Sequence, residues 1–174
     1  MNTYQAIIDT PIGNLGIQAS ETYLYRIDFL PKTIPLKSPC TFAAELTCQQ
    51  LLNYFQDPNW IFELPCELSI TPFQRRVLDQ LCLIPPGKTL SYSDIAKKTH
   101  TGPRSVGTVC RLNPIPIVIP CHRVTGKHDI GGFGGAAAGP AITMKHWLLQ
   151  HESSDFCKDS LTNRYTKRHA TVVT

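Results

Sequence analysis

A cysteine and a histidine, Cys121 and His122, are adjacent in the segment Ile119-Pro120-Cys121-His122-Arg123-Val124. Cysteine attacks as the thiolate, and a neighbouring imidazole is a common means of forming one. Side chains at adjacent positions diverge in a helix or a strand, so this pair can cooperate only across a sharp turn or through a bridging water. Pro120 favours such a turn. The alternative for an isolated Cys-His dipeptide is a small apolar cysteine that ends a buried strand.

Several short motifs surround this pair. Upstream are Thr71-Pro72-Phe73-Gln74, Pro85-Pro86-Gly87-Lys88, Ser91-Tyr92, Arg104-Ser105-Val106-Gly107 and Asn113-Pro114. Downstream are Gly131-Gly132-Phe133-Gly134-Gly135, Lys145-His146-Trp147-Leu148-Leu149 and Glu152. In this order the motifs resemble those of the O6-alkylguanine-DNA alkyltransferases, also called methylated-DNA–protein-cysteine methyltransferases. The resemblance is strong from Thr71 to Glu152 and weaker before Thr71, where only a Thr-Pro-Ile-Gly opening and Tyr54-Phe55 carry it.

The resemblance implies DNA repair by direct, stoichiometric and irreversible transfer of an alkyl group from O6-alkylguanine, and also from O4-alkylthymine, to Cys121. His122 would accept the thiol proton through a water, and Glu152 would hold the imidazole in the useful tautomer, as the third group of a triad does. The product thioether has no carbonyl for water to attack, so the protein is expected to act once and to need no cofactor. The target base must leave the stacked duplex to reach the nucleophile. For Glu152 the alternative is a charge on a helix surface.

The same resemblance assigns roles to other residues. Tyr92 matches the tyrosine that crowds the target phosphate and hydrogen-bonds the flipped purine, with a core tyrosine as the alternative. Arg104 matches the arginine that fills the gap left by the flipped base, with an ordinary phosphate contact as the alternative. Asn113 matches the asparagine that braces the turn before the active-site strand. Backbone groups of Cys121 and Val124 would read the guanine edge.

Helix signals become frequent from Thr71 onward. Thr71 can cap a helix that has Pro72 in its first position, and Pro85-Pro86-Gly87 stops it. Its predicted apolar face carries Phe73, Val77 and Leu81.

Two further helices are predicted before the Cys-His pair. Ser91-x-x-Asp94 resembles a capping box that opens a helix running through Lys98. The next helix starts at Pro103 and stops before Asn113-Pro114. With Thr101-Gly102 as the turn between them, the two helices form a predicted helix-turn-helix.

The helix predicted from Pro103 has two different faces. One face is small and basic and carries Arg104, Gly107, Thr108 and Arg111. The other face is apolar and carries Val106, Val109 and Cys110. Most helix-turn-helix proteins place this helix in the major groove, but a nearly bare backbone flanked by arginines suits a minor groove about 6 Å wide. The resemblance likewise implies minor-groove binding to double-stranded DNA with little sequence preference. For Gly107 a helix-packing glycine is the alternative.

The first part of the chain is predicted to form a small α/β domain. Short strands are expected at Tyr4–Ile8, Leu15–Ile17 and Tyr23–Phe29, with Pro11-Ile12-Gly13-Asn14 as the turn between the first two. A helix is expected from Phe42 to Phe55. Its predicted apolar stripe carries Cys48, Leu51, Leu52 and Phe55.

The predicted fold class is therefore α+β. By resemblance, residues 1–67 form an RNase H-like domain, and residues 68–153 form a mostly helical winged helix-turn-helix domain for DNA binding and alkyl transfer. Residues 154–174 are a polar tail with no assigned function.

Composition excludes several classes of protein. The 174 residues, of which 42% are hydrophobic and 17% charged, suit one or two compact domains. No apolar run reaches the ~20 residues of a membrane span, and the first residues lack the layout of a secretory signal. Seven cysteines without a C-x-x-C pair favour neither a disulfide framework nor a zinc site. We expect a monomer without a bound metal in the cytoplasm, or in the nucleus if the source is eukaryotic.

The net charge of +4 is unevenly distributed. Residues 1–66 hold three Lys and Arg against six Asp and Glu, whereas residues 67–174 hold fourteen against seven. Basic charge is thus concentrated in the half that carries Cys121, as expected of a half that approaches phosphates. Solubilising surface charge is the alternative.

Three features depart from the family pattern. The stretch Ala136–Met144, between Gly135 and Lys145, is several residues longer than expected of relatives. Phe133 stands where many members have tyrosine, which removes a hydroxyl but keeps the stacking area. Gly134 stands where a small polar residue often supplies a hydrogen bond. These changes predict a roomier and less polar pocket that tolerates alkyl groups larger than methyl.

Three other functions fit parts of the sequence. An alkyltransferase-like sensor would bind alkylated DNA without repairing it, but such proteins lack the cysteine of the Pro-x-His-Arg motif. A cysteine hydrolase would turn over an ester or amide repeatedly, and it leaves Arg104 and Tyr92 unexplained. A helix-turn-helix regulator would protect a defined DNA site, whereas the repair protein is expected to bind with little sequence preference and strong salt dependence.

Overall fold

The structure is a computed structural model that describes residues 4–154. The described chain divides between Ser69 and Ile70 into two compact units, residues 4–69 and residues 70–154. Within the described residues, no helix is both long enough and apolar enough to cross a membrane. The predicted tail lies outside the described residues, except for Ser154, which ends the last helix.

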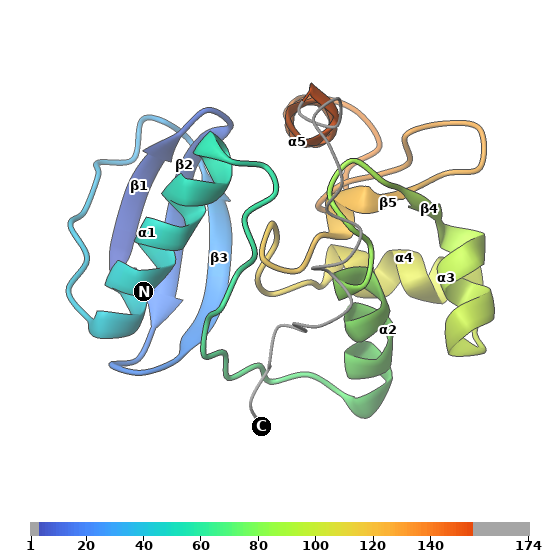
Figure 1. Ribbon diagram of the computed structural model, residues 1–174, viewed down its shortest axis with the longest axis horizontal. Coiled ribbons are helices and arrows are strands. Elements are labelled where there is room, and N and C mark those ends of the chain that lie inside the picture. Colours follow the sequence, from blue (N-terminus) through green and yellow to red (C-terminus); the bar gives the residue numbers. More distant parts are fainter. Residues whose placement is uncertain (1–3, 155–174) are drawn as a thin grey trace. The chain divides into compact units, whose positions relative to one another are not determined.

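The N-terminal unit is an antiparallel sheet with one helix along its face (Figure 1). Strands β1 (Ala6–Thr10), β2 (Gly13–Ala19) and β3 (Leu24–Leu30) lie in sequential order in the sheet. Helix α1 (Phe42–Gln56) contacts all three strands. Its first turn is capped by the Thr41 hydroxyl, which accepts the Ala44 N–H at 3.3 Å.

The structure corrects two details of this unit. Gly13 and Asn14 belong to β2 rather than to the turn, because Gly13 adopts φ +118°, which lets the hairpin close over two residues. The predicted stripe of α1 is also wrong in part. Leu52 is 43% exposed, whereas Tyr54 is fully buried because the buried face steps three residues from Leu51 to Tyr54.

The C-terminal unit is mostly helical. Its elements are α2 (Pro72–Cys82), β4 (Leu90–Ser91), α3 (Tyr92–Thr99), α4 (Pro103–Arg111), the 3-10 turn η1 (Cys121–Arg123), β5 (Val124–Thr125) and α5 (Pro140–Ser154). Strands β4 and β5 pair in parallel and bring Leu90 beside Val124. Helices α2, α3 and α4 pack against one another (Figure 1).

The capping box predicted at Ser91 is present, and the cap predicted at Thr71 is also a capping box, so both helix starts follow from local chemistry. The Thr71 hydroxyl accepts the Gln74 N–H, while the Gln74 side chain accepts the Thr71 N–H at 2.8 Å. Ser91 and Asp94 make the same reciprocal pair at the start of α3. Helix α3 ends at Thr99, its C-cap His100 adopts the left-handed conformation with φ +53°, and Gly102 is the N-cap of α4.

Two predictions for this unit differ from the structure: the buried face of α2 and the length of the loop after Gly135. In α2, Phe73 is only half-buried, and the guanidinium of Arg76 lies 5.5 Å from its ring centroid. The buried face of the helix is formed by Val77, Leu78 and Leu81. The predicted long stretch Ala136–Met144 is not all loop. Helix α5 begins at Pro140, because proline suits the first helical position, and Ala136–Gly139 alone remain loop.

Candidate active site

Cys121 lies in the sharp turn that its sequence context predicts. Pro120 has φ −81° and ψ 63°, and the 3-10 turn Cys121–Arg123 follows it directly. The Arg123 N–H donates to the Pro120 carbonyl at 3.0 Å, which closes this turn. All three residues of the turn are buried.

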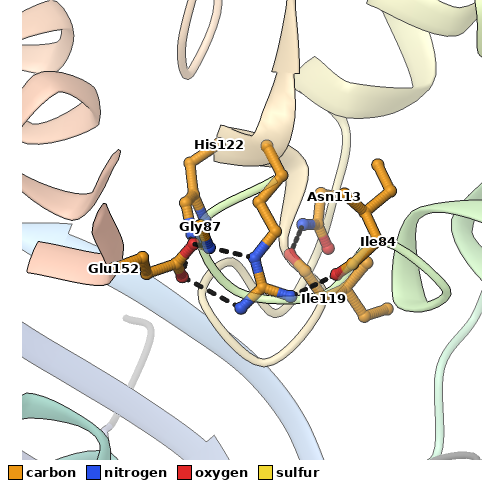
Figure 2. A network of polar contacts seen from close by, with 7 residues as sticks. Ile84, Gly87, Asn113, Ile119, His122 and Glu152 are labelled. Carbon is orange, nitrogen blue, oxygen red and sulfur yellow. Dashed lines mark hydrogen bonds and ion pairs between the residues drawn. The ribbon is translucent and has the colours of Figure 1, made fainter. Parts of the chain in front are cut away.

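The imidazole of His122 contacts the carboxylate of Glu152 from α5. Their Nε2 and Oε1 atoms are 2.7 Å apart, and both side chains are completely inaccessible to solvent (Figure 2). The alternative of a surface charge for Glu152 is therefore wrong. The fold brings a turn residue and a helix residue that are 30 positions apart into direct contact.

Burial and charge together determine the protonation states of this pair. Burial raises the pKa of Glu152, but the charges and hydrogen bonds of His122 and Arg123 outweigh it and hold the pKa of that carboxyl well below its usual range. Burial lowers the pKa of His122, and Glu152 opposes this only in part. A neutral imidazole beside an ionised carboxylate donates from Nε2, which leaves Nδ1 as the acceptor. In residues 4–154, Nδ1 has no hydrogen-bond partner.

The Cys121 thiol is nearly buried, with 6% of the residue exposed. Burial raises the pKa of this thiol, while a hydrogen bond with Asn113, the charge of Lys145 and nearby backbone N–H groups favour the thiolate. The net direction is upward, so the resting group is a thiol. A base must therefore remove its proton for the sulfur to act as a nucleophile.

Asn113 braces the loop between α4 and the Cys121 turn. Its Nδ2 donates to the carbonyl of Ile119 at 2.9 Å (Figure 2). Its Oδ1 accepts the N–H of Ile115 at 3.2 Å. The braced loop holds Ile117 at φ +75°, a conformation that β-branched residues rarely adopt. Asn113 thus supports both the backbone before Cys121 and the thiol itself.

A pocket of about 270 Å³ opens beside Cys121. It is lined by Tyr92, Gly107, Cys110, Arg111, Cys121, Gly132, Phe133, Gly134, Gly135, Ala136 and Ala137. Tyr92 is half-buried, and its hydroxyl donates to the carbonyl of Gly132 at 3.3 Å, so it is a pocket wall rather than a core tyrosine. Burial raises the pKa of Tyr92 to about 12. Its hydroxyl therefore remains protonated at neutral pH.

Helix α4 contributes one wall of this pocket. Gly107 lines it, and a Cβ built there would meet no atom closer than Tyr92 Cε1 at 3.9 Å, so helix packing does not require this glycine. Arg111 also lines the pocket, whereas Arg104 and Thr108 are exposed on the helix outside it. Cys110 was expected on the core face, but it lines the pocket.

Lys145 is a buried residue that the sequence did not single out as functional. Its ammonium donates to the carbonyls of Val124 at 2.6 Å and Gly132 at 2.9 Å. The Val124 carbonyl, one of the groups expected to read guanine, thus already accepts one hydrogen bond. Burial lowers the pKa of Lys145 to about 8. The signal available in the sequence was the seven-residue spacing from Lys145 to Glu152, which places both on one face of α5.

Among residues 4–154, Arg123 is the other buried charged residue to which the sequence assigned no role. Its Nε donates to Oε2 of Glu152 at 3.0 Å, and its Nη2 donates to Oε1 at 2.9 Å. Its Nη1 donates to the carbonyl of Ile84. Sequence reasoning used this arginine only as part of a motif, because nothing in its neighbourhood shows that it faces Glu152.

Known proteins share both the sequence and the fold of this chain. A family model described as "6-O-methylguanine DNA methyltransferase, DNA binding domain" matches residues 72–154. A methylated-DNA–protein-cysteine methyltransferase of Archaeoglobus fulgidus is 46% identical over 85 residues, which are 49% of this chain and 58% of that protein. A probable methylated-DNA–protein-cysteine methyltransferase of Acanthamoeba polyphaga mimivirus is 36% identical over 86% of this chain and 96% of its own length.

A solved structure extends the likeness to three dimensions. The crystal structure of Mycobacterium tuberculosis OGT in complex with DNA is similar with a TM-score of 0.70 and 34% identity, covering 85% of this chain and 91% of that one. This match, like that with the mimivirus protein, covers most of both chains. The chain therefore belongs to the methylated-DNA–protein-cysteine methyltransferase family.

Proposed function

We propose that this protein repairs DNA by moving an alkyl group from O6-alkylguanine, and also from O4-alkylthymine, to its own Cys121. The observation that carries the proposal is the arrangement at the pocket. A cysteine at the wall of a base-sized pocket is followed directly by a histidine whose Nε2 is engaged by a buried carboxylate. That arrangement leaves Nδ1 of His122 to accept a proton.

In the proposed reaction His122 Nδ1 takes the Cys121 proton through a water. The sulfur then attacks the alkyl carbon in line with O6, an S–C bond forms, and the C–O6 bond breaks with its electron pair moving to the base, which takes up a proton. Glu152 stabilises the transient imidazolium. Because the resulting thioether offers water no electrophilic carbonyl, each molecule reacts once, without a cofactor or metal.

We further propose double-stranded DNA as the partner, bound by α4 in the minor groove with little sequence preference. The exposed Arg104 and Thr108 and the pocket-lining Gly107 and Arg111 support this placement, because they combine positive charge with a bare backbone. Arg104 would fill the gap left by the flipped base. Tyr92 and Phe133 would contact the purine, with Gly134 beside it and backbone groups of Cys121 and Val124 reading its edge.

The finer domain assignments belong to the same proposal. Residues 1–67 are taken as an RNase H-like domain and residues 68–153 as the winged helix-turn-helix domain that binds DNA and transfers the alkyl group. The protein would act as a monomer in the cytoplasm, or in the nucleus of a eukaryote.

Intact-protein mass spectrometry tests the proposal most directly. After incubation with duplex DNA containing O6-methylguanine, the protein should gain one methyl group on Cys121. Cys121→Ala should abolish the gain while DNA affinity is kept. Cys110→Ala is the matched control, because Cys110 lines the same pocket without a neighbouring histidine, and burial raises its pKa to about 12. This variant should still be methylated.

The same experiment separates the rival functions. A protein that binds the alkylated duplex but gains no methyl group would be a sensor, and the proposal would be rejected. Methylation that persists in Cys121→Ala and disappears in Cys110→Ala would move the nucleophile to α4. Repeated turnover of a small ester, without any stable adduct, would favour a hydrolase.

A further inference from the structure

We propose that Arg123 is a positioning residue that acts through Glu152, holding His122 neutral with Nδ1 open as the base for Cys121. The inference depends on the proposed function, since it assigns a role to Arg123 in the same proton transfer. Arg123 is not among the residues that line the pocket, and its guanidinium donates to Glu152 and to the Ile84 carbonyl. Its effect on the reaction must therefore pass through the carboxylate.

The geometry of the carboxylate supports this role. Arg123 grips Glu152 with two parallel N–H donors, and the side chains of the two residues are 5% and 0% exposed. His122 shares Oε1 with Arg123, and the Gly87 N–H lies 3.4 Å from Oε2 (Figure 2). A bidentate guanidinium constrains both the position and the plane of a carboxylate, which a single ammonium does not.

Arg123 is itself anchored by a separate part of the chain. Its Nη1 donates to the carbonyl of Ile84, in the loop that follows α2, and Gly87 belongs to the same loop (Figure 2). The carboxylate is thus held between the Cys121 turn, helix α5 and the loop after α2. Rotation of Glu152 away from His122 would break contacts to Arg123 as well as the contact to Gly87.

The charges around His122 give this arrangement a chemical consequence. The groups that affect the imidazole are Glu152 and Lys145 on α5 and Arg123 on its own turn, with the Cys121 thiol next in the chain. Burial is the main cause of the lowered pKa of His122, and the positive charges of Arg123 and Lys145 act in the same direction. Glu152 acts in the opposite direction.

Removing Arg123 would therefore leave an ionised carboxylate beside His122 without its counter-charge. The pKa of His122 would rise, and an imidazolium cannot accept the thiol proton. Removing the charge of Glu152 instead would lower the pKa of His122 further. The imidazole would also no longer be held in the tautomer with its proton on Nε2. Protonation of His122 should make the transfer rate fall at low pH, and this fall is the acidic limb of the pH–rate profile. The two changes should move the acidic limb in opposite directions, which a loss of folding would not do.

Single-turnover transfer from a methylated duplex, measured from mildly acidic to mildly alkaline pH, tests this. Arg123→Met should shift the acidic limb to higher pH, with recovery at alkaline pH. If the pKa of His122 rises by about one, the rate on that limb should fall about tenfold. Arg123→Lys should shift the acidic limb less than Arg123→Met does, because lysine keeps the positive charge but cannot donate two parallel hydrogen bonds to Glu152. Glu152→Gln should move it to lower pH and reduce the maximal rate.

A loss of rate in Arg123→Met by the same factor at every pH would overturn the inference. Because an unpaired buried carboxylate can prevent folding, the double variant Arg123→Met/Glu152→Gln supplies a charge-free comparison. It should show no upward shift of the limb. Thermal melts and affinity for unmodified DNA establish that each variant is folded.

Nitrogen NMR of His122 in the unmodified protein gives a second measurement that needs no variant to fold. A neutral ring with the proton on Nε2 at neutral pH is expected. A proton on Nδ1, or an imidazolium, would overturn the inference. The NMR signals can be read whether or not Cys121 accepts a methyl group, so failure of the proposed function is distinguishable from failure of the role of Arg123.

Discussion

The ammonium nitrogen of Lys145 lies 2.9 Å from the carbonyl oxygen of Gly132, a residue of the pocket wall. The same nitrogen binds the carbonyl of Val124, the residue that follows the Cys121 turn. The Tyr92 hydroxyl donates to the same Gly132 carbonyl at 3.3 Å. One buried cation and one hydroxyl therefore tie the Gly132 loop to α5, β5 and α3.

The lowered pKa of Lys145 predicts a pH-dependent contribution to stability. The pKa falls from 10.5 to about 8 on folding, so between these values the unfolded chain binds the proton and the folded protein does not. Stability rises with pH wherever the unfolded state binds more protons. The contribution of Lys145 to the free energy of unfolding should thus increase from about pH 8 to pH 10.5.

Urea denaturation of the protein and of Lys145→Met across this range measures that contribution. As pH rises, the free energy of unfolding of the unmodified protein should increase relative to that of Lys145→Met. A difference that stays constant with pH would show that the folded-state pKa of Lys145 is not lowered. Lys97→Met on the exposed face of α3 is the control for loss of a lysine charge, and an equal trend in this variant would contradict the assignment to Lys145.

A second prediction concerns the glycines of the pocket loop. Gly131 has φ +68°, and a Cβ there would lie 2.8 Å from Tyr92 Cε2. Gly131→Ala should therefore destabilise the protein both by about 1 kcal/mol of backbone strain and by displacing the tyrosine ring. Gly134→Ala carries the strain alone, since its φ is +57° and no atom lies within 4 Å of the added carbon.

Chemical denaturation and single-turnover rates compare these two variants. Gly131→Ala should lose more stability than Gly134→Ala and should also transfer methyl groups more slowly, because Tyr92 lines the pocket. Equal losses of stability and rate in the two variants would mean that Tyr92 moves aside without consequence.

Pocket composition predicts tolerance of large alkyl groups. Four of the eleven lining residues are glycines and two are alanines, so six of the eleven have no side chain beyond Cβ. We expect O6-benzylguanine to react readily, and Ala137→Leu to slow the benzyl reaction more than the methyl reaction. The neighbouring Ala138, which does not line the pocket, supplies the control variant Ala138→Leu.

The measurement is the ratio of the second-order rate constants for benzyl and methyl substrates. Ala137→Leu should lower this ratio and Ala138→Leu should leave it unchanged. The prediction would be contradicted if the unmodified protein reacted poorly with benzylguanine relative to a family member that carries a small polar residue at the position of Gly134.

The proposed place of Arg104 predicts a substrate-dependent defect. If Arg104 fills the gap left by a flipped base, Arg104→Ala must slow repair of duplex DNA, where extrusion of the base costs a few kcal/mol. Transfer from free O6-benzylguanine involves no extrusion and should keep its rate. Comparing the two substrates by single-turnover kinetics tests this role. Equal slowing of both would indicate damage to the pocket instead.

An ordinary phosphate contact at Arg104 predicts a different result. In that case Arg104→Ala would weaken binding to all duplexes alike and reduce the slope of log affinity against log salt by about 1. The rate at saturating DNA would then stay unchanged.

Much of the C-terminal unit was predictable because its signals are local. The capping boxes at Thr71 and Ser91, the proline starts at Pro72 and Pro103, and the turn at Pro120 each depend on residues within one helical turn. The stripe of α1 and the loop after Gly135 were predicted less well. The burial of Tyr54 depends on what α1 packs against, and the start of α5 depends on what α5 packs against.

The residue types determined by themselves which chemistry is possible, since a Cys-His pair after proline can form a nucleophile and its base across a sharp turn or through a bridging water. They did not determine that Glu152 is buried against His122 or that Arg123 binds this carboxylate. Nor did they determine that Lys145 binds the carbonyl of Gly132 or that Cys110 lines the pocket. Those contacts join residues far apart in the chain. Only packing of α5 and α2 around the Cys121 turn removes water from His122, Arg123 and Glu152, and removal of water contributes to the pKa shifts of His122 and Glu152.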